Sequence, residues 1–280
     1  GRAAHRTLDE RLSPPAGLMG AFIFAAQLIK FPVAGGTSCH FIGAALSFII
    51  LGPWLGLLTM TAVIALQALL FQDGGLVVMG ANILVMGVVP GFVGYQIYRL
   101  GVGRGRAART AVTGFAAWLS IIAAALVTTL LLAFSGTTSL TIALPVMLGV
   151  HALIGIGEAL ISVAALAFIA RTRPTLLENG QEEGRGSWVM IGLIIALLVV
   201  LLAPFASGHP DGLEWVAGLA GFNDAAQDAP ITLLPDYTIP FLGESGLSTI
   251  LAGLVGAAVV AGVVFLLSRL LKGRRVTSGK

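Results

Sequence analysis

The segment from Phe31 to His40 holds the residues of this 280-residue chain that are best suited to bind a metal ion. It reads Phe-Pro-Val-Ala-Gly-Gly-Thr-Ser-Cys-His, so a flexible polar turn leads into an apolar run that begins at His40. Neutral imidazole is the most common nitrogen ligand for nickel, cobalt, copper and zinc ions in proteins. His40 is therefore a candidate metal ligand, and the alternative is a histidine hydrogen-bonded within a helix cap.

The residues just before His40 are expected to support this site. Gly35 and Gly36 give the backbone freedom to turn, and Thr37 and Ser38 contribute hydroxyl groups. The adjacent thiol of Cys39 is the less favoured ligand, because consecutive residues at a helix start tend to point apart. As the single cysteine of the chain, it also excludes an intrachain disulfide framework.

A second polar stretch runs from Gln67 to Asn82 and includes the sequence Asp73-Gly74-Gly75. This tripeptide is typical of a turn. The alternative is that Asp73 attracts cations or orders a lid over the site. We count Gln67, Asp73 and Asn82 as possible supports of the site.

Two ionisable residues fall within a long apolar run. His151 and Glu158 are seven residues apart, which places them on one helix face. Burying an ionisable group at bilayer depth costs about 2.5–3.5 kcal/mol on insertion scales, so such residues usually have a partner. Glu158 is expected to pair with Lys30 or with another subunit, in a structural polar contact. A proton relay through His151 and Glu158 is the alternative.

The composition indicates the environment in which these residues are positioned. The chain is 57% hydrophobic and 10% charged, whereas a soluble domain carries about 25% charged residues. Its net charge of +3 comes from short basic clusters between apolar runs, which membrane topology explains better than nucleic acid does. We therefore expect the lipid bilayer as surroundings and no nucleic-acid partner. The sequence has no phosphate-binding Gly-x-x-x-x-Gly-Lys-Ser/Thr loop and no hydrolase motif, so we expect no enzyme activity.

Apolar segments of membrane-spanning character recur along the chain, and we predict an all-α integral membrane protein with about eight transmembrane helices. The second segment is too short to span comfortably, which implies that the preceding loop dips into the membrane. A helix should break or turn at Gly52-Pro53, which follows this second segment. The eight segments are Pro15–Val33, His40–Leu51, Trp54–Phe71, Ala81–Leu100, Val112–Phe134, Thr141–Ala170, Trp188–Ala203 and Leu247–Leu271.

Charged residues predict the orientation. With eight crossings, fifteen of the sixteen basic residues fall on one face and only Lys30 falls on the other. The positive-inside rule makes that face cytoplasmic, with both ends of this chain, in the inner (cell) membrane. The segment 205–246 lies on the outer face and has no Lys or Arg, but it has six acidic residues: Asp211, Glu214, Asp224, Asp228, Asp236 and Glu244.

The charged stretch Arg171–Gly186 contains Pro174 and reads as a linker. It divides the chain into a six-helix unit, residues 1–178, and a two-helix unit, residues 187–280, which carries the acidic outer loop. Small residues recur every four positions on the first helix and on the last, which permits close helix contact. Internal packing is the default interpretation of both sets, and docking to a partner membrane protein is the alternative. The sets are Gly17, Ala21 and Ala25, and Gly253, Ala257 and Ala261.

Several ordered blocks resemble the CbiM/NikM family, the substrate-binding membrane components (S components) of cobalt/nickel energy-coupling-factor transporters. They are Phe31–His40, Leu51-Gly52-Pro53-Trp54, Gln67 to Gly75, Gly80-Ala81-Asn82-Ile83 and His151 to Leu160. The sequence Pro210-Asp211-Gly212-Leu213-Glu214 resembles the signature of the CbiN/NikN-like PDGLE domain, which some members carry as a fusion.

The resemblance implies a six-helix S-component-like bundle beside a two-helix accessory unit. It also implies uptake of Ni²⁺ or Co²⁺ driven by a transmembrane coupling (T) subunit and ATPase (A) subunits, with the metal as cargo and no cofactor. In the family, the ion is held in a square-planar nitrogen site. His40 matches the histidine of the family's Gly-Gly-Thr-Ser-x-His loop. The remaining ligands are expected from an N-terminal Met-His segment that this sequence, which starts at Gly1, does not include.

Two other functions stay open at this point. One is an ion- or proton-coupled secondary metal carrier that uses His151 and Glu158. The other is a non-binding assembly or regulatory subunit, which would be expected if the N-terminal metal segment is truly absent.

Overall fold

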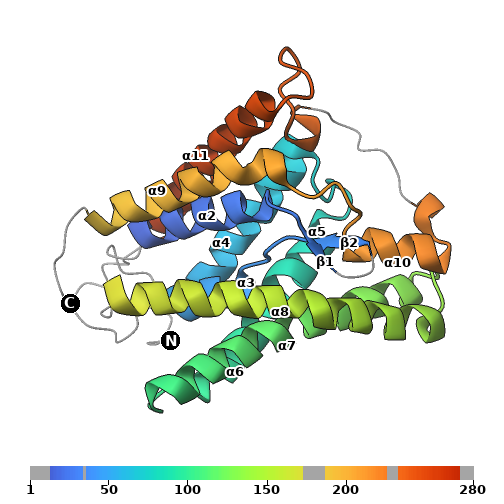
Figure 1. The fold of residues 1–280 in the computed structure, drawn as a ribbon, viewed down its shortest axis with the longest axis horizontal. Helices are drawn as coiled ribbons and strands as arrows, with labels where there is room; N and C mark the ends of the chain where they lie inside the picture. Colours follow the sequence, from blue (N-terminus) through green and yellow to red (C-terminus); the bar gives the residue numbers. More distant parts are fainter. Residues whose placement is uncertain (1–12, 34–35, 173–186, 226–232, 272–280) are drawn as a thin grey trace, which may run out of the picture.

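The computed structural model describes residues 13–33, 36–172, 187–225 and 233–271, and its fold is almost entirely helical (Figure 1). Each of the eight apolar segments lies mainly in helix, as predicted. The main helices of the first unit are α2 (Ser13–Gln27), α3 (Ala44–Leu51), α4 (Pro53–Leu66), α6 (Val89–Arg99), α7 (Arg106–Phe134) and α8 (Leu140–Thr172). Those of the second unit are α9 (Ser187–Leu202), α10 (Gly212–Ala220) and α11 (Gly246–Leu270).

Eight full crossings are not established by the helix lengths. Among the described residues, five helical stretches are long and apolar enough to cross a membrane: Pro53–Phe71, Met79–Arg99, Arg106–Phe134, Leu140–Thr172 and Gly246–Leu270. The helix α3 has 8 residues, and at about 1.5 Å per residue it covers much less than the roughly 30 Å of a hydrocarbon core. The six-plus-two arrangement therefore stays a prediction.

The break between α3 and α4 lies where the sequence predicts it. α3 ends at Leu51, Gly52 has φ 78° and ψ 165°, and α4 starts with Pro53 at its first position. Proline is favoured there, because the first helical N–H has no partner within the helix. The eight residues of α3 are all buried, so this short helix belongs to the centre of the bundle.

The loop before α3 differs from the prediction. Residues Phe31–Val33 (β1) and Thr37–Cys39 (β2) form a two-stranded antiparallel hairpin in which Phe31 faces Cys39. The apolar run therefore does not become helical at His40, because the chain is extended through Cys39 and α3 starts only at Ala44. Pairing satisfies backbone groups that an irregular buried loop would leave without partners.

The polar stretch after α4 is a turn between two π-helical segments. These are η2 (Gln67–Phe71) and η3 (Ile83–Val88), the latter preceded by the short helix α5 (Met79–Asn82). Gly74 and Gly75 have φ angles of 79° and 70°, which glycine adopts readily. The amide of Asn82 donates to the carbonyl of Gly74 at 3.1 Å and holds the turn closed. π-bulges of this kind are frequent at functional sites.

The small residues of α2 pack inside the chain. A Cβ on Gly17 would lie 2.9 Å from the carbonyl oxygen of Ala261 on α11, and Ala21 and Ala25 are buried. The α2–α11 pair is among the most extensive helix contacts between described elements, and α9 packs against α2 as well. This face is thus occupied by α11 of the second unit, which corresponds to the internal-packing interpretation rather than to an open docking face.

The bundle has two ends of different character (Figure 1). The starts of α2, α7 and α9 and the ends of α6, α8 and α11 lie toward the left in this view, while the hairpin and α10 lie toward the right. The helix ends that border the basic clusters of the sequence therefore share one side. The candidate site lies away from that side, as the charge pattern predicts.

Candidate metal site

The hairpin places His40 between two fixed pieces of backbone. Cys39, just before it, is paired with Phe31, and Phe41, just after it, is 1% exposed and packs edge-on against Phe22. The His40 side chain is only partly buried, and its Nδ1 lies 3.5 Å from the carbonyl oxygen of Phe41, a weak contact at best. The imidazole is therefore available to a ligand while the backbone that carries it is held.

Other predicted residues of this loop shape the hairpin. Gly36 has φ 82° in the turn, whereas Thr37 and Ser38 are buried rather than facing an open site. Gly35 lies outside the described residues.

The outer loop of the second unit runs along this hairpin. The N–H of Ser207 donates to the carbonyl of Lys30 at 2.6 Å, and the N–H of Ser38 donates to the carbonyl of Pro210 at 2.7 Å. The hydroxyl groups of Thr37 and Ser38 donate to the carbonyls of Pro210 and His209, at 3.1 and 2.8 Å. Ser38 also forms a parallel β-bridge with Asp211. The hydroxyls expected to support a metal site thus bind the second unit.

The Pro-Asp-Gly-Leu-Glu sequence starts the helix α10, which was not among the predicted elements. The Asp211 carboxylate accepts from the N–H groups of Leu213 and Glu214, at 2.8 and 2.9 Å, and the Glu214 carboxylate accepts from the N–H of Asp211 at 3.0 Å. This reciprocal pattern is a capping box. The spacing Asp-x-x-Glu before an apolar run is the signal that could have revealed α10.

The glycine of this sequence lets α10 approach α8. A Cβ on Gly212 would lie 2.8 Å from Cδ1 of Ile154 and 3.0 Å from Cε1 of His151. His151 therefore faces the start of α10, and its Nδ1 lies 2.8 Å from the carbonyl oxygen of Met147 on its own helix.

Replacing Asp211 by alanine should loosen α10 without unfolding the protein. Loss of a helix cap costs about 0.5–2 kcal/mol, so the amides of Leu213 and Glu214 should exchange with solvent several-fold faster. Hydrogen exchange followed by mass spectrometry measures this. Asp224→Ala, which removes an exposed carboxylate of the same loop, is the control and should leave these amides unchanged.

Glu158 is bound to backbone rather than to a basic residue. Its two carboxylate oxygens accept from the N–H groups of Ile42 and Gly43, both at 2.8 Å, and the side chain is 2% exposed. The predicted pairing with Lys30 is not what the structure shows. His151 contacts Met147 on its own helix and the start of α10, whereas Glu158 contacts the backbone just before α3. The two residues therefore have different partners.

Cys39, the less favoured candidate ligand, is buried. Its thiol donates to the carbonyl of His40 at 3.0 Å, and the side chain is 6% exposed. Burial raises the pKa of the Cys39 thiol, and the nearby carboxylates of Glu158 and Asp211 raise it further. Since the thiolate is the reactive species, Cys39 should be inert in the folded protein.

We predict that a maleimide reagent labels Cys39 at least about a hundredfold more slowly in the folded protein than after unfolding, because reaction requires local opening. Mass spectrometry of intact protein in mild detergent and in denaturant gives the two rates. Labelling at equal rates would show that the hairpin is not closed as described.

The second polar stretch also binds the outer loop. The Tyr237 hydroxyl donates to the Asp73 carboxylate at 2.6 Å, and the amide of Gln67 donates to the Tyr237 hydroxyl at 3.4 Å. The Tyr237 ring stacks on Phe71 with centroids 4.6 Å apart, and the N–H of Leu234 donates to the carbonyl of Leu70. Gln67 and Asp73 therefore form a second attachment point for the outer loop.

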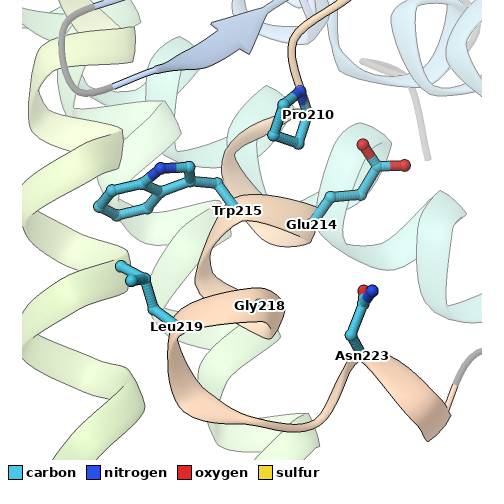
Figure 2. A pocket seen from close by; sticks show the side chains of 6 residues that line it. All are labelled: Pro210, Glu214, Trp215, Gly218, Leu219 and Asn223. Carbon is cyan, nitrogen blue, oxygen red and sulfur yellow. The ribbon is translucent and has the colours of Figure 1, made fainter.

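A shallow hollow of about 520 Å³ lies along α10 (Figure 2). Figure 2 shows Trp215 and Leu219 on one side of this helix and Glu214 and Asn223 on the other. Glu214 already accepts the capping bond from Asp211, so its carboxylate has a structural role here. Within the described part of the chain, no three His, Cys, Asp or Glu side chains are close enough to hold a metal ion together.

Two contributors to the site were missed by sequence reasoning. Gln27 donates to the carbonyl of Ile42 at 2.9 Å, and Tyr237 binds Asp73 as described. Neither has a local signal, because each acts on a segment far away in the sequence.

Comparison with known families covers nearly the whole chain. Residues 2–176 match the CbiM model, described as a cobalt uptake substrate-specific transmembrane region, and residues 185–273 match the PDGLE domain. A protein of Archaeoglobus fulgidus that is named as a putative fused nickel transport protein NikMN is 36% identical over 274 residues, and the match covers 96% of this chain and 90% of that protein.

Two further matches agree. A fused nickel transport protein NikMN from Rhodobacter capsulatus is 28% identical over 306 residues, with 94% of this chain and 88% of that protein covered. A crystal structure of a truncated transition metal transporter is 31% identical with a TM-score of 0.54, and the match covers 61% of this chain and 86% of that one.

Proposed function

Because this chain belongs to the CbiM family and carries a PDGLE domain, we propose that it is the substrate-binding membrane subunit of an ATP-driven energy-coupling-factor transporter that imports Ni²⁺ or Co²⁺. Relatives named as nickel and cobalt transport proteins support a metal-transport membrane component rather than an enzyme. The observation that carries the proposal is the accessible imidazole of His40 on a backbone that is held on both sides.

In this proposal, His40 supplies one nitrogen ligand and the family's Met-His segment supplies the others. Square-planar nitrogen ligation suits Ni²⁺ and disfavours Zn²⁺, which prefers tetrahedral sites. A coupling subunit and two ATPase subunits provide the energy. The positive-inside rule makes the end of the bundle that borders the basic clusters cytoplasmic, so the ion would be taken up at the hairpin end.

The alternative functions need other arrangements. A proton-coupled carrier would use His151 and Glu158, yet Glu158 is already bound by two backbone N–H groups. Metal uptake in cells that survives deletion of the ATPase subunits would nevertheless favour such a carrier. A non-binding assembly subunit is the function expected if no Met-His segment accompanies this sequence.

Titration of Ni²⁺ into the purified protein, with and without a restored Met-His N-terminal segment, tests the proposal. With the segment, we expect the wild-type protein to bind Ni²⁺ tightly. His40→Ala should lose roughly more than 100-fold in Ni²⁺ affinity, which exceeds the 10–100-fold loss typical of changing a residue that only supports a ligand. His209→Ala is the matched control, because it removes an exposed imidazole near the hairpin while keeping the carbonyl that Ser38 binds. If neither form binds and His40→Ala changes nothing, the metal assignment is wrong.

A further inference from the structure

Two buried polar side chains bind the backbone of one residue, Ile42, at the root of the hairpin. Glu158 from α8 accepts from the N–H of Ile42, and Gln27, the last residue of α2, donates to the carbonyl of the same residue. The three heavy-atom distances, including that from Glu158 to the N–H of Gly43, are 2.8, 2.9 and 2.8 Å. Ile42 is thus held on both sides by helices that are far apart in the sequence.

These contacts are not needed to cap a helix in the ordinary way. The residue that caps α3 is Gly43, with φ 76°, and it has no side chain to offer. A Cβ there would lie 2.8 Å from Cε1 of Phe41, so a capping side chain at this position would collide with its neighbour. Glu158 does not replace this cap, because it accepts from the N–H groups of Ile42 and Gly43, which precede the first residue of α3.

The effect of this arrangement falls on His40. The β-pairing of Cys39 fixes the chain one residue before it, and Glu158 and Gln27 fix the chain two residues after it. Between these points, Phe41 is buried, so the backbone of His40 has little freedom. Its side chain is left partly exposed while the segment that carries it is fixed.

Metal ligands that are held in place in advance bind more tightly, because less ordering remains to be done on binding. We propose that Glu158 and Gln27 are positioning residues of the metal site, which hold the Ile42 peptide and thereby fix His40 for the ion. This proposal rests on the proposed function and names two residues that act through His40 without touching the metal.

Because Cys39 is the single cysteine of the chain, opening of the segment around His40 can be measured without metal. Cys39 adjoins His40 and is buried, so its rate of maleimide labelling reports opening of this segment. Glu158→Gln replaces one accepting oxygen by an NH₂ group facing an N–H, and Gln27→Met keeps the shape but removes the donor. Both should label at least about tenfold faster than the wild type, because each opens a buried hydrogen-bonded contact. Glu158→Gln also removes a charge that raises the pKa of the Cys39 thiol, so Gln27→Met, which changes no charge, is the variant whose rate reports opening alone.

Ser162→Ala is the matched control. Ser162 lies one turn beyond Glu158 on α8, is buried, and has a hydroxyl oxygen with no hydrogen-bond partner among the described residues. Its removal should leave the labelling rate unchanged. Melting temperatures of all variants show whether faster labelling follows from general destabilisation.

Nickel binding to the form with the Met-His segment then tests the functional part. We expect Glu158→Gln and Gln27→Met to lose roughly 10–100-fold in Ni²⁺ affinity and to shift the visible absorption band of the bound ion, which reports ligand geometry. Ser162→Ala should do neither. A purely structural role would lower the melting temperature and leave the band in place.

The outcomes separate the two proposals. Unchanged labelling in both variants overturns the positioning role, whatever the ion does. Faster labelling with unchanged nickel affinity and spectrum also overturns it, while the proposed function stands. If the form with the Met-His segment and otherwise wild-type sequence binds no Ni²⁺, the proposed function is overturned, and the labelling rates then decide alone whether Glu158 and Gln27 hold the His40 segment.

Discussion

Gly17→Leu is expected to force α2 away from α11 and to lower the melting temperature. The obstacle is backbone, the carbonyl oxygen of Ala261 at 2.9 Å from the added Cβ, so a side-chain rotation cannot relieve it. Overpacking a well-packed contact costs about 1–3 kcal/mol, and an immovable neighbour places this variant at the upper end or beyond. Thermal unfolding in detergent and hydrogen exchange in α11 measure the effect.

Gly262→Leu is the matched control. It makes the same substitution on α11, at an exposed glycine with no heavy atom within 4 Å of the added Cβ. Both variants gain the same helix propensity, so the difference between them isolates the α2–α11 contact. Equal melting temperatures would mean that the two helices do not approach as closely as described.

Tyr237→Ala is expected to release the second half of the outer loop from the bundle. The ring stacks on Phe71 and packs edge-on against Phe24 but is half-buried, so its removal should cost less than the about 3–5 kcal/mol of a fully buried aromatic side chain. Asp236 and Tyr237 have φ angles of 50° and 56°, which non-glycine residues adopt only where their surroundings hold them. Without the ring, this strained segment should relax and become sensitive to protease.

Tyr237→Phe separates the hydroxyl from the ring. It should keep the stacking and lose only the bond to Asp73, so protease sensitivity should rise far less than in Tyr237→Ala. Limited proteolysis with peptide mapping over residues 233–246 gives both values. Similar cleavage of the wild type and Tyr237→Ala would contradict the anchoring role.

The same contact predicts a pH dependence. Burial raises the pKa of Tyr237 well above its ordinary value, and the charge of Asp73 and the hydrogen bond to it act in the same direction. Because the folded state keeps the proton more tightly than the unfolded state, the contribution to stability is complete below the ordinary tyrosine pKa of about 10 and falls as the pH rises above it. Tyr237→Phe should flatten this alkaline part of the stability profile.

The apolar helices could be predicted because each requires only composition over a long window. The break at Gly52-Pro53 was predictable for a similar local reason. The hairpin was not, because its strands have three residues each and show no alternation long enough to recognise. Its pairing depends on residues 207–211 from the other unit, a contact that no local window contains.

At the candidate site, too, features that depend on local sequence could be predicted, and contacts between distant segments could not. His40 could be proposed from residue type and position, but the partners that hold it could not. Glu158 was expected to need a partner, and a basic residue seemed the natural choice. Two backbone N–H groups satisfy a carboxylate equally well, and sequence does not reveal which buried N–H groups lack a partner.

The attachment of the outer loop has a consequence for the fusion of the two units into one polypeptide. The loop is hydrogen-bonded to the hairpin at Ser38 and to the turn at Asp73, and α11 packs against α2. The second unit therefore contacts the first unit at three separate places. All three contacts are made by described residues of the two units. Because one polypeptide carries both units, their stoichiometry is one to one, and we expect two polypeptides divided within 173–186 still to assemble through these contacts.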